Sequence, residues 1–224
     1  MYKLEIGDLT YELNGKWTVQ EWQELKKYDA SLDFTWPKLL STATGAPLEL
    51  CAKIPDETLQ VGVALVSSLL QPSWSSPAKT YRQGKLTEFD KLTIGQFIDC
   101  EVAIGRGLET WMHLLVGSLY NAEPEKVKTW EIQKIYPAVH NYLNWRMDLY
   151  KKYESLFEFN ESDEDGPKTD AGYIWYDMLM VLADEKFLNI KAAAERPVFE
   201  ALNYIAWRKD QAKKEELERK KLKV

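Results

Sequence analysis

Residues that carry metal or nucleophilic chemistry are scarce in this chain. Among 224 residues there are two cysteines, Cys51 and Cys100, far apart in sequence, and two histidines, His113 and His140. A structural metal site needs about four ligands and a disulfide framework needs several cysteine pairs. We therefore expect reduced thiols, as in a cytosolic protein, and no metal or other cofactor.

Long apolar runs are also missing. A membrane-spanning helix needs about eighteen or more consecutive apolar residues, and the sequence contains no such run. Residues 1–6 lack the apolar centre of a signal peptide. Because hydrophobic residues still make up 45% of the chain, with nine tryptophans, it can build a real core. We expect a soluble intracellular protein that does not bind membranes.

Charge is unevenly distributed along the chain. The net charge is −6, but residues 208–224 carry eight Lys or Arg and four Asp or Glu. That segment is therefore at +4, which leaves −10 on residues 1–207. An acidic body argues against general nucleic-acid affinity. The basic segment alone could contact phosphates, but its interspersed glutamates favour a solvated or partner-binding helix.

The end of the chain predicts a helix that changes character partway. An apolar stripe at helical spacing runs through Val198, Leu202 and Ile205 and ends after Trp207. A helix with one apolar face packs on a core, whereas one that is polar all round projects into water or toward a partner. We therefore predict a projecting, charged helical arm over residues 208–224.

The remaining sequence predicts a mainly α protein. Apolar residues alternate near the start, and Asn14-Gly15 is a tight-turn signal, so a short β-ribbon is expected there. Thr18 and Glu21 form a capping-box pattern that begins the helical part. No internal repeat is apparent. The fold class expected is a helical bundle with a short N-terminal β-hairpin and a projecting C-terminal helix. Its predicted segments are the ribbon (1–17), a helical body (18–157) with a Ser/Pro-rich excursion (72–91), an acidic loop (158–172), a C-terminal helical segment (173–207) and the arm (208–224).

Two pairs of residues in the predicted helical stretch after Thr93 are candidates for a catalytic site. Glu109 and His113 are one turn apart and could share a metal ion, but metal sites in bundles take ligands from several helices. A pair on the helix surface is the favoured interpretation. Asp99 and Glu101 fall on opposite flanks of their helix, so both are expected to be solvated. We expect no enzymatic activity.

Aromatic residues crowd the second half of the chain. Tyr and Trp are favoured at interfaces because one edge is apolar and the other can form hydrogen bonds. Most of these rings are expected to fill the core, and Trp207, at the end of the apolar stripe, is the strongest interface candidate. The predicted partner-binding residues are Trp175, Tyr176, Tyr204, Trp207, Arg208 and Lys209.

Several segments resemble tailed-phage tail assembly chaperones and baseplate-hub assembly proteins. Residues 17–22, Trp-Thr-Val-Gln-Glu-Trp, are similar to the opening of such proteins. Residues 92–99, Leu-Thr-Ile-Gly-Gln-Phe-Ile-Asp, followed by residues 114–120, are similar to a sequence motif of tail assembly chaperones. The ending, from residues 181–183 through 197–202 to the charged tail, also looks like these proteins.

The resemblance implies a non-enzymatic protein that binds the tail tape-measure or baseplate-hub protein during assembly. It would act in the host cytoplasm and could form a homo-oligomer. Two alternatives stay open. One is a structural virion protein of the tail or baseplate. The other is a helical metalloenzyme centred on Glu109 and His113.

Overall fold

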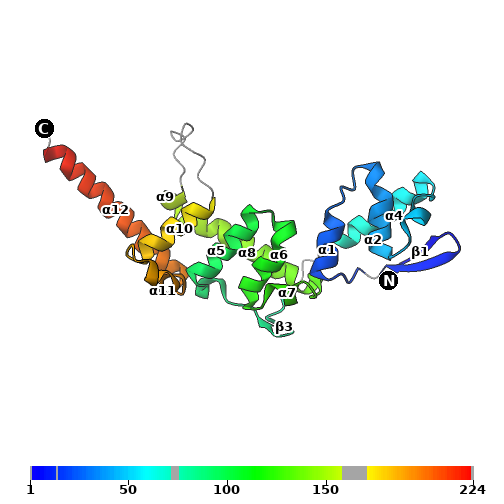
Figure 1. Ribbon diagram of the computed structural model, residues 1–224, viewed down its shortest axis with the longest axis horizontal. Coiled ribbons are helices and arrows are strands. Elements are labelled where there is room, and N and C mark those ends of the chain that lie inside the picture. The colour runs from blue at the N-terminus through cyan, green and yellow to red at the C-terminus, as the bar shows by residue number, and fades with distance from the viewer. Residues whose placement is uncertain (1, 14, 72–75, 158–170, 223–224) are drawn as a thin grey trace. The chain divides into compact units, whose positions relative to one another are not determined.

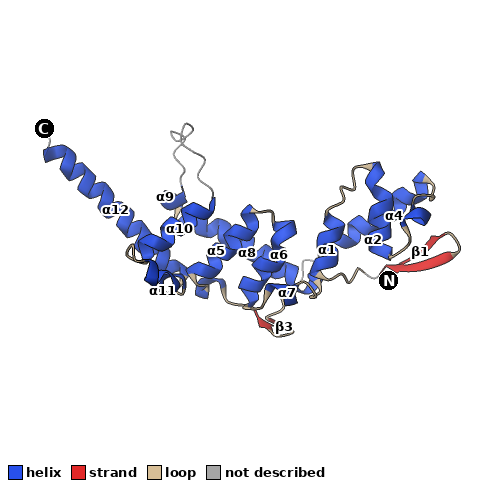
Figure 2. Ribbon diagram, viewed as in Figure 1, coloured by secondary structure: helices blue, strands red, loops and turns tan. Residues whose placement is uncertain are grey.

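The computed structural model describes residues 2–13, 15–71, 76–157 and 171–222 (Figure 1). Asn14, the start of the Ser/Pro-rich excursion and most of the predicted acidic loop lie outside the described residues. The chain is mainly α-helical with a short N-terminal hairpin (Figure 2), which confirms the predicted fold class. Within the described residues, none of the helices combines the length and apolar character needed to cross a membrane.

The chain packs as two compact units. Unit 1 comprises residues 1–83 and 123–138, and unit 2 comprises residues 84–122 and 139–224. The predicted helical body, residues 18–157, is therefore divided between the two units.

The N-terminal ribbon is an antiparallel hairpin in unit 1. Its strands, β1 (Tyr2–Ile6) and β2 (Leu9–Leu13), pair in register from Tyr2 opposite Leu13 to Ile6 opposite Leu9. Gly7 takes a positive φ of 63° in the connecting turn, a conformation that glycine adopts without strain. Ile6 and Leu13 are buried, so the predicted alternation places one face of the hairpin on the core.

The helices of unit 1 begin and end at residues with clear local causes. Pro37 occupies the first turn of its helix, where a missing N–H costs nothing. Gly45 ends that helix in the left-handed conformation, with φ 74°. Trp22 is buried, and its indole N–H donates to the Leu70 carbonyl at 3.2 Å. The elements are α1 (Val19–Lys26), α2 (Trp36–Thr44), α3 (Leu48–Cys51), α4 (Asp56–Leu70), the strand β3 (Thr80–Tyr81), α7 (Pro124–Val127) and the first residues of α8 (Ile132–Lys152).

Unit 2 is built around two helices that pack against each other, α5 (Ile94–Gly105) and α6 (Leu108–Tyr120). Gly107, with φ 105°, separates these two helices, because it adopts a backbone conformation outside the helical region. The other elements are β4 (Gly84–Lys85), the rest of α8, α9 (Glu154–Phe157), α10 (Ala171–Leu182), α11 (Ile190–Ala194) and α12 (Val198–Leu222).

Both units contain the same kind of helix start. Thr18 accepts a hydrogen bond from the Glu21 amide at 3.2 Å, while the Glu21 carboxylate accepts from the Thr18 amide at 2.8 Å. Thr93 and Gln96 form the equivalent pair at 3.1 and 3.0 Å. These capping boxes satisfy amides that a helix start leaves without partners. The prediction at Thr18 and Glu21 is confirmed.

Each capping box also lies beside an antiparallel bridge to the start of a later helix. The bridge joins Thr18 to Glu131 in unit 1 and Thr93 to Pro197 in unit 2. A local structural repetition therefore exists that the sequence did not reveal. The bridging hydrogen bonds are Val19 N to Trp130 O (2.8 Å) and Ile132 N to Trp17 O (2.9 Å) in unit 1, and Ile94 N to Arg196 O (2.8 Å) and Val198 N to Leu92 O (2.9 Å) in unit 2.

Candidate interaction surface

The C-terminal helix α12 is packed at its beginning and exposed along the rest of its length. Val198, Ala201 and Leu202 are fully buried. From residue 210 to residue 221 the described side chains are exposed except for the half-buried Gln211. The helix continues without a break through this change, as Figure 1 shows. The predicted arm is thus helical as far as Leu222, and little of its surface contributes to the core of unit 2.

Three contacts hold α12 between Phe199 and the beginning of the arm at Lys209. The Tyr153 hydroxyl donates to Asn203 Oδ1 at 2.7 Å, and the Lys152 ammonium lies 4.5 Å from the centre of the Phe199 ring. Lys209 donates from Nζ to the Ser155 carbonyl in α9. The Lys209 charge is therefore engaged at a helix end inside its own unit. This placement sets Lys209 apart from the partner-binding residues with which it was predicted.

Tyr204 and Trp207 form an exposed aromatic pair where the buried stripe of α12 ends. Their ring centroids are 5.8 Å apart with planes tilted by 40°, and the residues are 39% and 53% exposed. Arg208 follows and is exposed. Aromatic side chains next to an arginine are the composition most enriched at energetically important interface positions. These three residues are the candidate interaction surface.

The remaining two predicted partner-binding residues, Trp175 and Tyr176, differ in exposure. Tyr176 is exposed on α10, as a partner-binding residue must be. Trp175 is 8% exposed and packs edge-on against Phe97, with centroids 5.6 Å apart and planes at 85°. Its ring also lies 6.4 Å from that of Phe157. Trp175 is therefore a core residue, and its prediction as a contact for partners is corrected.

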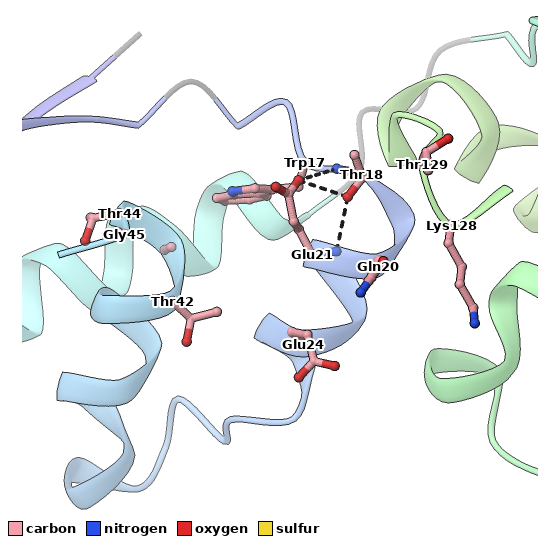
Figure 3. A pocket seen from close by; sticks show the side chains of 11 residues that line it. Trp17, Thr18, Gln20, Glu21, Glu24, Thr42, Thr44, Gly45, Lys128 and Thr129 are labelled. Carbon is pink, nitrogen blue, oxygen red and sulfur yellow. Dashed lines mark hydrogen bonds between the residues drawn. The ribbon is translucent and has the colours of Figure 1, made fainter. Parts of the chain in front are cut away.

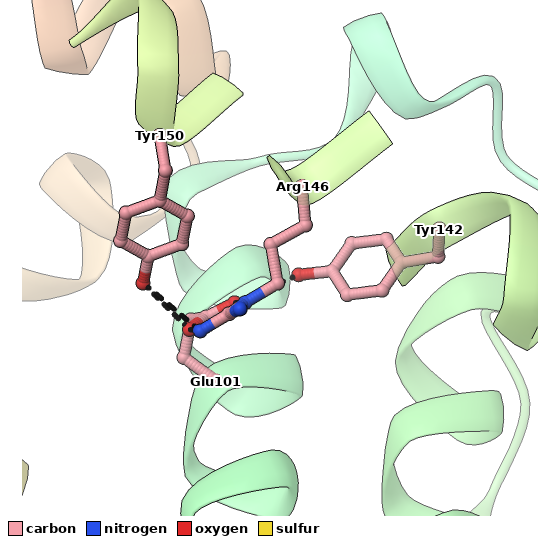
Figure 4. Close-up of polar contacts among 4 residues, drawn as sticks. All are labelled: Glu101, Tyr142, Arg146 and Tyr150. Carbon is pink, nitrogen blue, oxygen red and sulfur yellow. Dashed lines mark hydrogen bonds and ion pairs between the residues drawn. The ribbon is translucent and has the colours of Figure 1, made fainter. Parts of the chain in front are cut away.

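A buried ion pair lies among the aromatic rings of unit 2 (Figure 4). Arg146 in α8 donates from Nε and Nη2 to the two carboxylate oxygens of Glu101 in α5, at 2.6 and 2.7 Å. The Tyr150 hydroxyl donates to Glu101 Oε2 at 2.7 Å, and the Tyr142 hydroxyl lies 3.4 Å from Oε1. Because Glu101 is buried, the prediction that this side chain is solvated is wrong.

This cluster is arranged for stability. Burial raises the pKa of the Tyr142 hydroxyl well above its ordinary value, and the Glu101 charge adds to the rise. Burial likewise raises the pKa of Tyr150, again with Glu101 contributing. Burial acts to lower the pKa of Arg146, but hydrogen bonding to Glu101 and its charge outweigh that effect and raise it. The raised pKa values keep both tyrosine hydroxyls protonated and Arg146 charged, and all three side chains form hydrogen bonds to Glu101.

The surroundings of Cys100 and of the Glu109 and His113 pair do not favour catalysis or metal binding either. Burial raises the pKa of the Cys100 thiol, and its Sγ lies 3.9 Å from the Leu115 carbonyl oxygen. A raised pKa disfavours the nucleophilic thiolate. Within the described parts of the chain, no three His, Cys, Asp or Glu side chains form a group that could hold a metal ion. The Glu109 and His113 pair therefore gains no further ligand among those residues.

Unit 1 carries an open groove with a cavity volume of about 670 Å³ (Figure 3). It lies between the first turns of α1, the end of α2 and the chain at residues 128–129. Seven of its eleven lining residues carry a hydroxyl, amide or carboxylate group, although apolar atoms make up more of the exposed lining. No sequence motif pointed to this groove, because its walls come from three separate parts of the chain.

Comparison with models of protein families, with curated proteins and with solved structures gives no match for this chain. Its function is therefore inferred from its own residues and their arrangement.

Proposed function

We propose that this chain is a non-enzymatic assembly chaperone that binds a partner protein through Tyr204, Trp207 and Arg208. One observation carries the proposal: two large aromatic rings lie exposed side by side on α12, immediately beyond its buried stripe. A ring left exposed within a well-packed unit is available to enter a pocket on a partner. The contacts made by Lys209 and Tyr153 hold these rings in place beforehand, which reduces the entropy lost on binding.

The partner proposed is a long helical protein of the phage tail, the tape-measure or the baseplate-hub protein. The likeness of residues 92–99 and of the ending to tail assembly chaperones supports this choice. An amphipathic helix of such a partner offers an apolar face against which aromatic anchors pack. The proposed site of action is the host cytoplasm during tail assembly.

A structural virion protein of the tail or baseplate is the second candidate, and the hairpin favours it. Within the described residues, β1 and β2 pair only with each other, so each strand keeps an edge that can accept another strand. Tyr2 and Leu9 are also exposed on this hairpin. Permanent contacts in a particle would cover such features.

The test compares infected-cell lysate with purified virions by quantitative mass spectrometry. The proposal predicts that the tagged chain retains the tape-measure or hub protein in lysate and is absent from particles. Trp207→Ala should lose the partner, whereas Phe34→Ala, which removes an exposed aromatic from unit 1, should keep it. A fixed copy number in particles would support the structural alternative. Retention of no tail protein would contradict both.

Elemental analysis of the purified protein tests the remaining hypothesis, a helical metalloenzyme centred on Glu109 and His113. Zinc or iron at stoichiometric amounts would support a metal site and would argue against a purely non-enzymatic role.

A further inference from the structure

Strand β1 presents a backbone edge that can bind another strand. Within the described residues, β1 and β2, red in Figure 2, pair only with each other. Their turn has two residues, so the flanking Ile6 and Leu9 start a ladder in which hydrogen-bonded and non-hydrogen-bonded pairs alternate. The backbone N–H and C=O groups of Leu4 therefore point toward β2, and those of Lys3 and Glu5 point away from it. Outward groups of this kind are a template for strand pairing.

The charged side chains of β1 are complementary to those of a second β1. Antiparallel pairing centred on Leu4 places Lys3 opposite Glu5 and Glu5 opposite Lys3. Both side chains are exposed, and neither forms an ion pair with another described side chain. Opposite charges directly across two strands stabilise the pairing, and like charges destabilise it. In this same register the outward backbone groups of Lys3 and Glu5 face each other and can exchange hydrogen bonds.

The other face of β1 also fits this register. Tyr2, Leu4 and Ile6 share that face, because side chains alternate along a strand. Leu4 would lie opposite Leu4 of the second copy. Tyr2, which is 50% exposed, would lie opposite Ile6, and pairs of an aromatic with a β-branched side chain are among those that stabilise sheets. Pairing of two β1 strands would thus cover an exposed ring.

A second copy is the occupant that matches this edge. Each chain contains one β1 strand, so pairing of β1 with β1 requires two chains. A β2 strand is less suitable, because it carries no basic residue. If β2 of another chain lay beside β1 in the register of the hairpin, it would form one opposite-charge pair, Lys3 with Glu12, instead of two.

We propose that two copies of this chain dimerise by antiparallel pairing of their β1 strands. The two hairpins then form one sheet in the order β2, β1, β1, β2, with a two-fold axis at Leu4. Because both copies use the same surface, the contact is closed and the dimer is its end point. The contact includes neither Tyr204 nor Trp207, so dimerisation holds or fails independently of the proposed partner binding.

Sedimentation velocity of the full chain tests the contact. The wild-type protein should show a monomer–dimer equilibrium and no larger species as its concentration rises. E5K turns both opposite-charge pairs into like-charge pairs and should weaken dimerisation at least about tenfold. E49K makes the same charge change at an exposed position of α3 and should leave dimerisation unchanged.

A charge exchange identifies the register. K3E/E5K restores two opposite-charge pairs between the copies and should regain most of the affinity that E5K loses. If β2 of another chain were beside β1, the same exchange would set a glutamate against Glu12 and could not restore binding. Melting temperatures check that the variant hairpins stay folded, since position 3 also faces Glu12 within the hairpin.

Proline tests the backbone edge separately from the charges. E5P removes an outward N–H that β2 does not use, a position where edge strands tolerate proline, and should abolish dimerisation. E5Q keeps this N–H and should weaken dimerisation less than E5K does. A wild-type chain that is monomeric at every concentration would overturn the proposal, as would oligomers larger than dimers. So would equal effects of E5K and E49K, or a dimer that E5P leaves intact.

Discussion

Arg146 holds Glu101 by two nearly equal hydrogen bonds, 2.6 and 2.7 Å long, although 45 residues separate them in the chain. The two side chains differ in burial, at 27% exposed for Arg146 and 4% for Glu101. A carboxylate in this position depends on its partner much more than the guanidinium does, because only the Arg146 side chain is partly exposed to water. The pair therefore fixes α8 against α5 within unit 2.

Removing either partner should destabilise unit 2 to different extents. Arg146→Met leaves a buried carboxylate without its cation and should lower the free energy of unfolding by about 3 kcal/mol. Glu101→Gln leaves a guanidinium that can still be hydrated and should cost about 1–2 kcal/mol. Urea denaturation followed by tryptophan fluorescence measures both. A larger loss for Glu101→Gln would contradict this account of the pair.

Alkaline pH should unfold the chain as its buried tyrosines ionise. Burial raises the pKa of Tyr120 to about 12 and also raises those of Tyr142 and Tyr150. Since the folded pKa lies above the unfolded value near 10, the stabilisation is complete below pH about 10 and is lost as the pH rises further. Part of the tyrosinate absorbance should appear together with the loss of helix. Complete titration near pH 10 with intact helices would contradict this.

Two glycines of α5 should respond in opposite ways to alanine. A Cβ at Gly95 would lie 3.0 Å from the Ala194 carbonyl oxygen, whereas one at Gly105 would meet no atom within 4 Å. Gly95→Ala should therefore force α5 from α11 and cost about 1–3 kcal/mol. Gly105→Ala should be neutral or stabilising by up to about 1 kcal/mol. Thermal unfolding of both variants tests the close approach, which equal melting temperatures would contradict.

Local features of this fold were predictable because their causes are close in sequence. Thr18 and Glu21 form a capping box within four consecutive residues, and the change of α12 from buried to exposed follows its composition. The exposure of Trp207 could be predicted for the same reason, since the apolar stripe ends beside it.

Other features depend on which segments meet in space. Trp175 and Tyr176 are adjacent aromatics with no sequence signal to separate them, yet one packs on Phe97 and the other is exposed. The burial of Glu101 depends on a distant arginine. The groove of unit 1 requires α1, α2 and residues 128–129 to come together. The periodicity of a single sequence does not predict which of these distant segments come into contact.

Trp207 and Trp175 should separate binding from stability. Trp207→Ala removes a half-exposed ring and should change the free energy of unfolding by less than about 1 kcal/mol. It should nevertheless weaken partner binding by about 2 kcal/mol or more if the ring is an interface anchor. Trp175→Ala removes a core ring and should cost about 3–5 kcal/mol of stability. A large stability loss for Trp207→Ala with binding intact would place Trp207 in the core instead.

Shortening the arm should separate its anchored part from its exposed part. Deleting residues 210–224 removes side chains that, as far as residue 221, are exposed apart from the half-buried Gln211, so the cooperativity of unfolding should stay unchanged. Deleting residues 209–224 also removes the Lys209 contact with the Ser155 carbonyl, and a hydrogen bond from a charged group contributes up to a few kcal/mol, less where water competes. The longer deletion should therefore melt slightly earlier in calorimetry, with the same sharpness. If the shorter deletion already abolishes cooperative folding, the arm belongs to the core, and the prediction of a projecting arm is wrong.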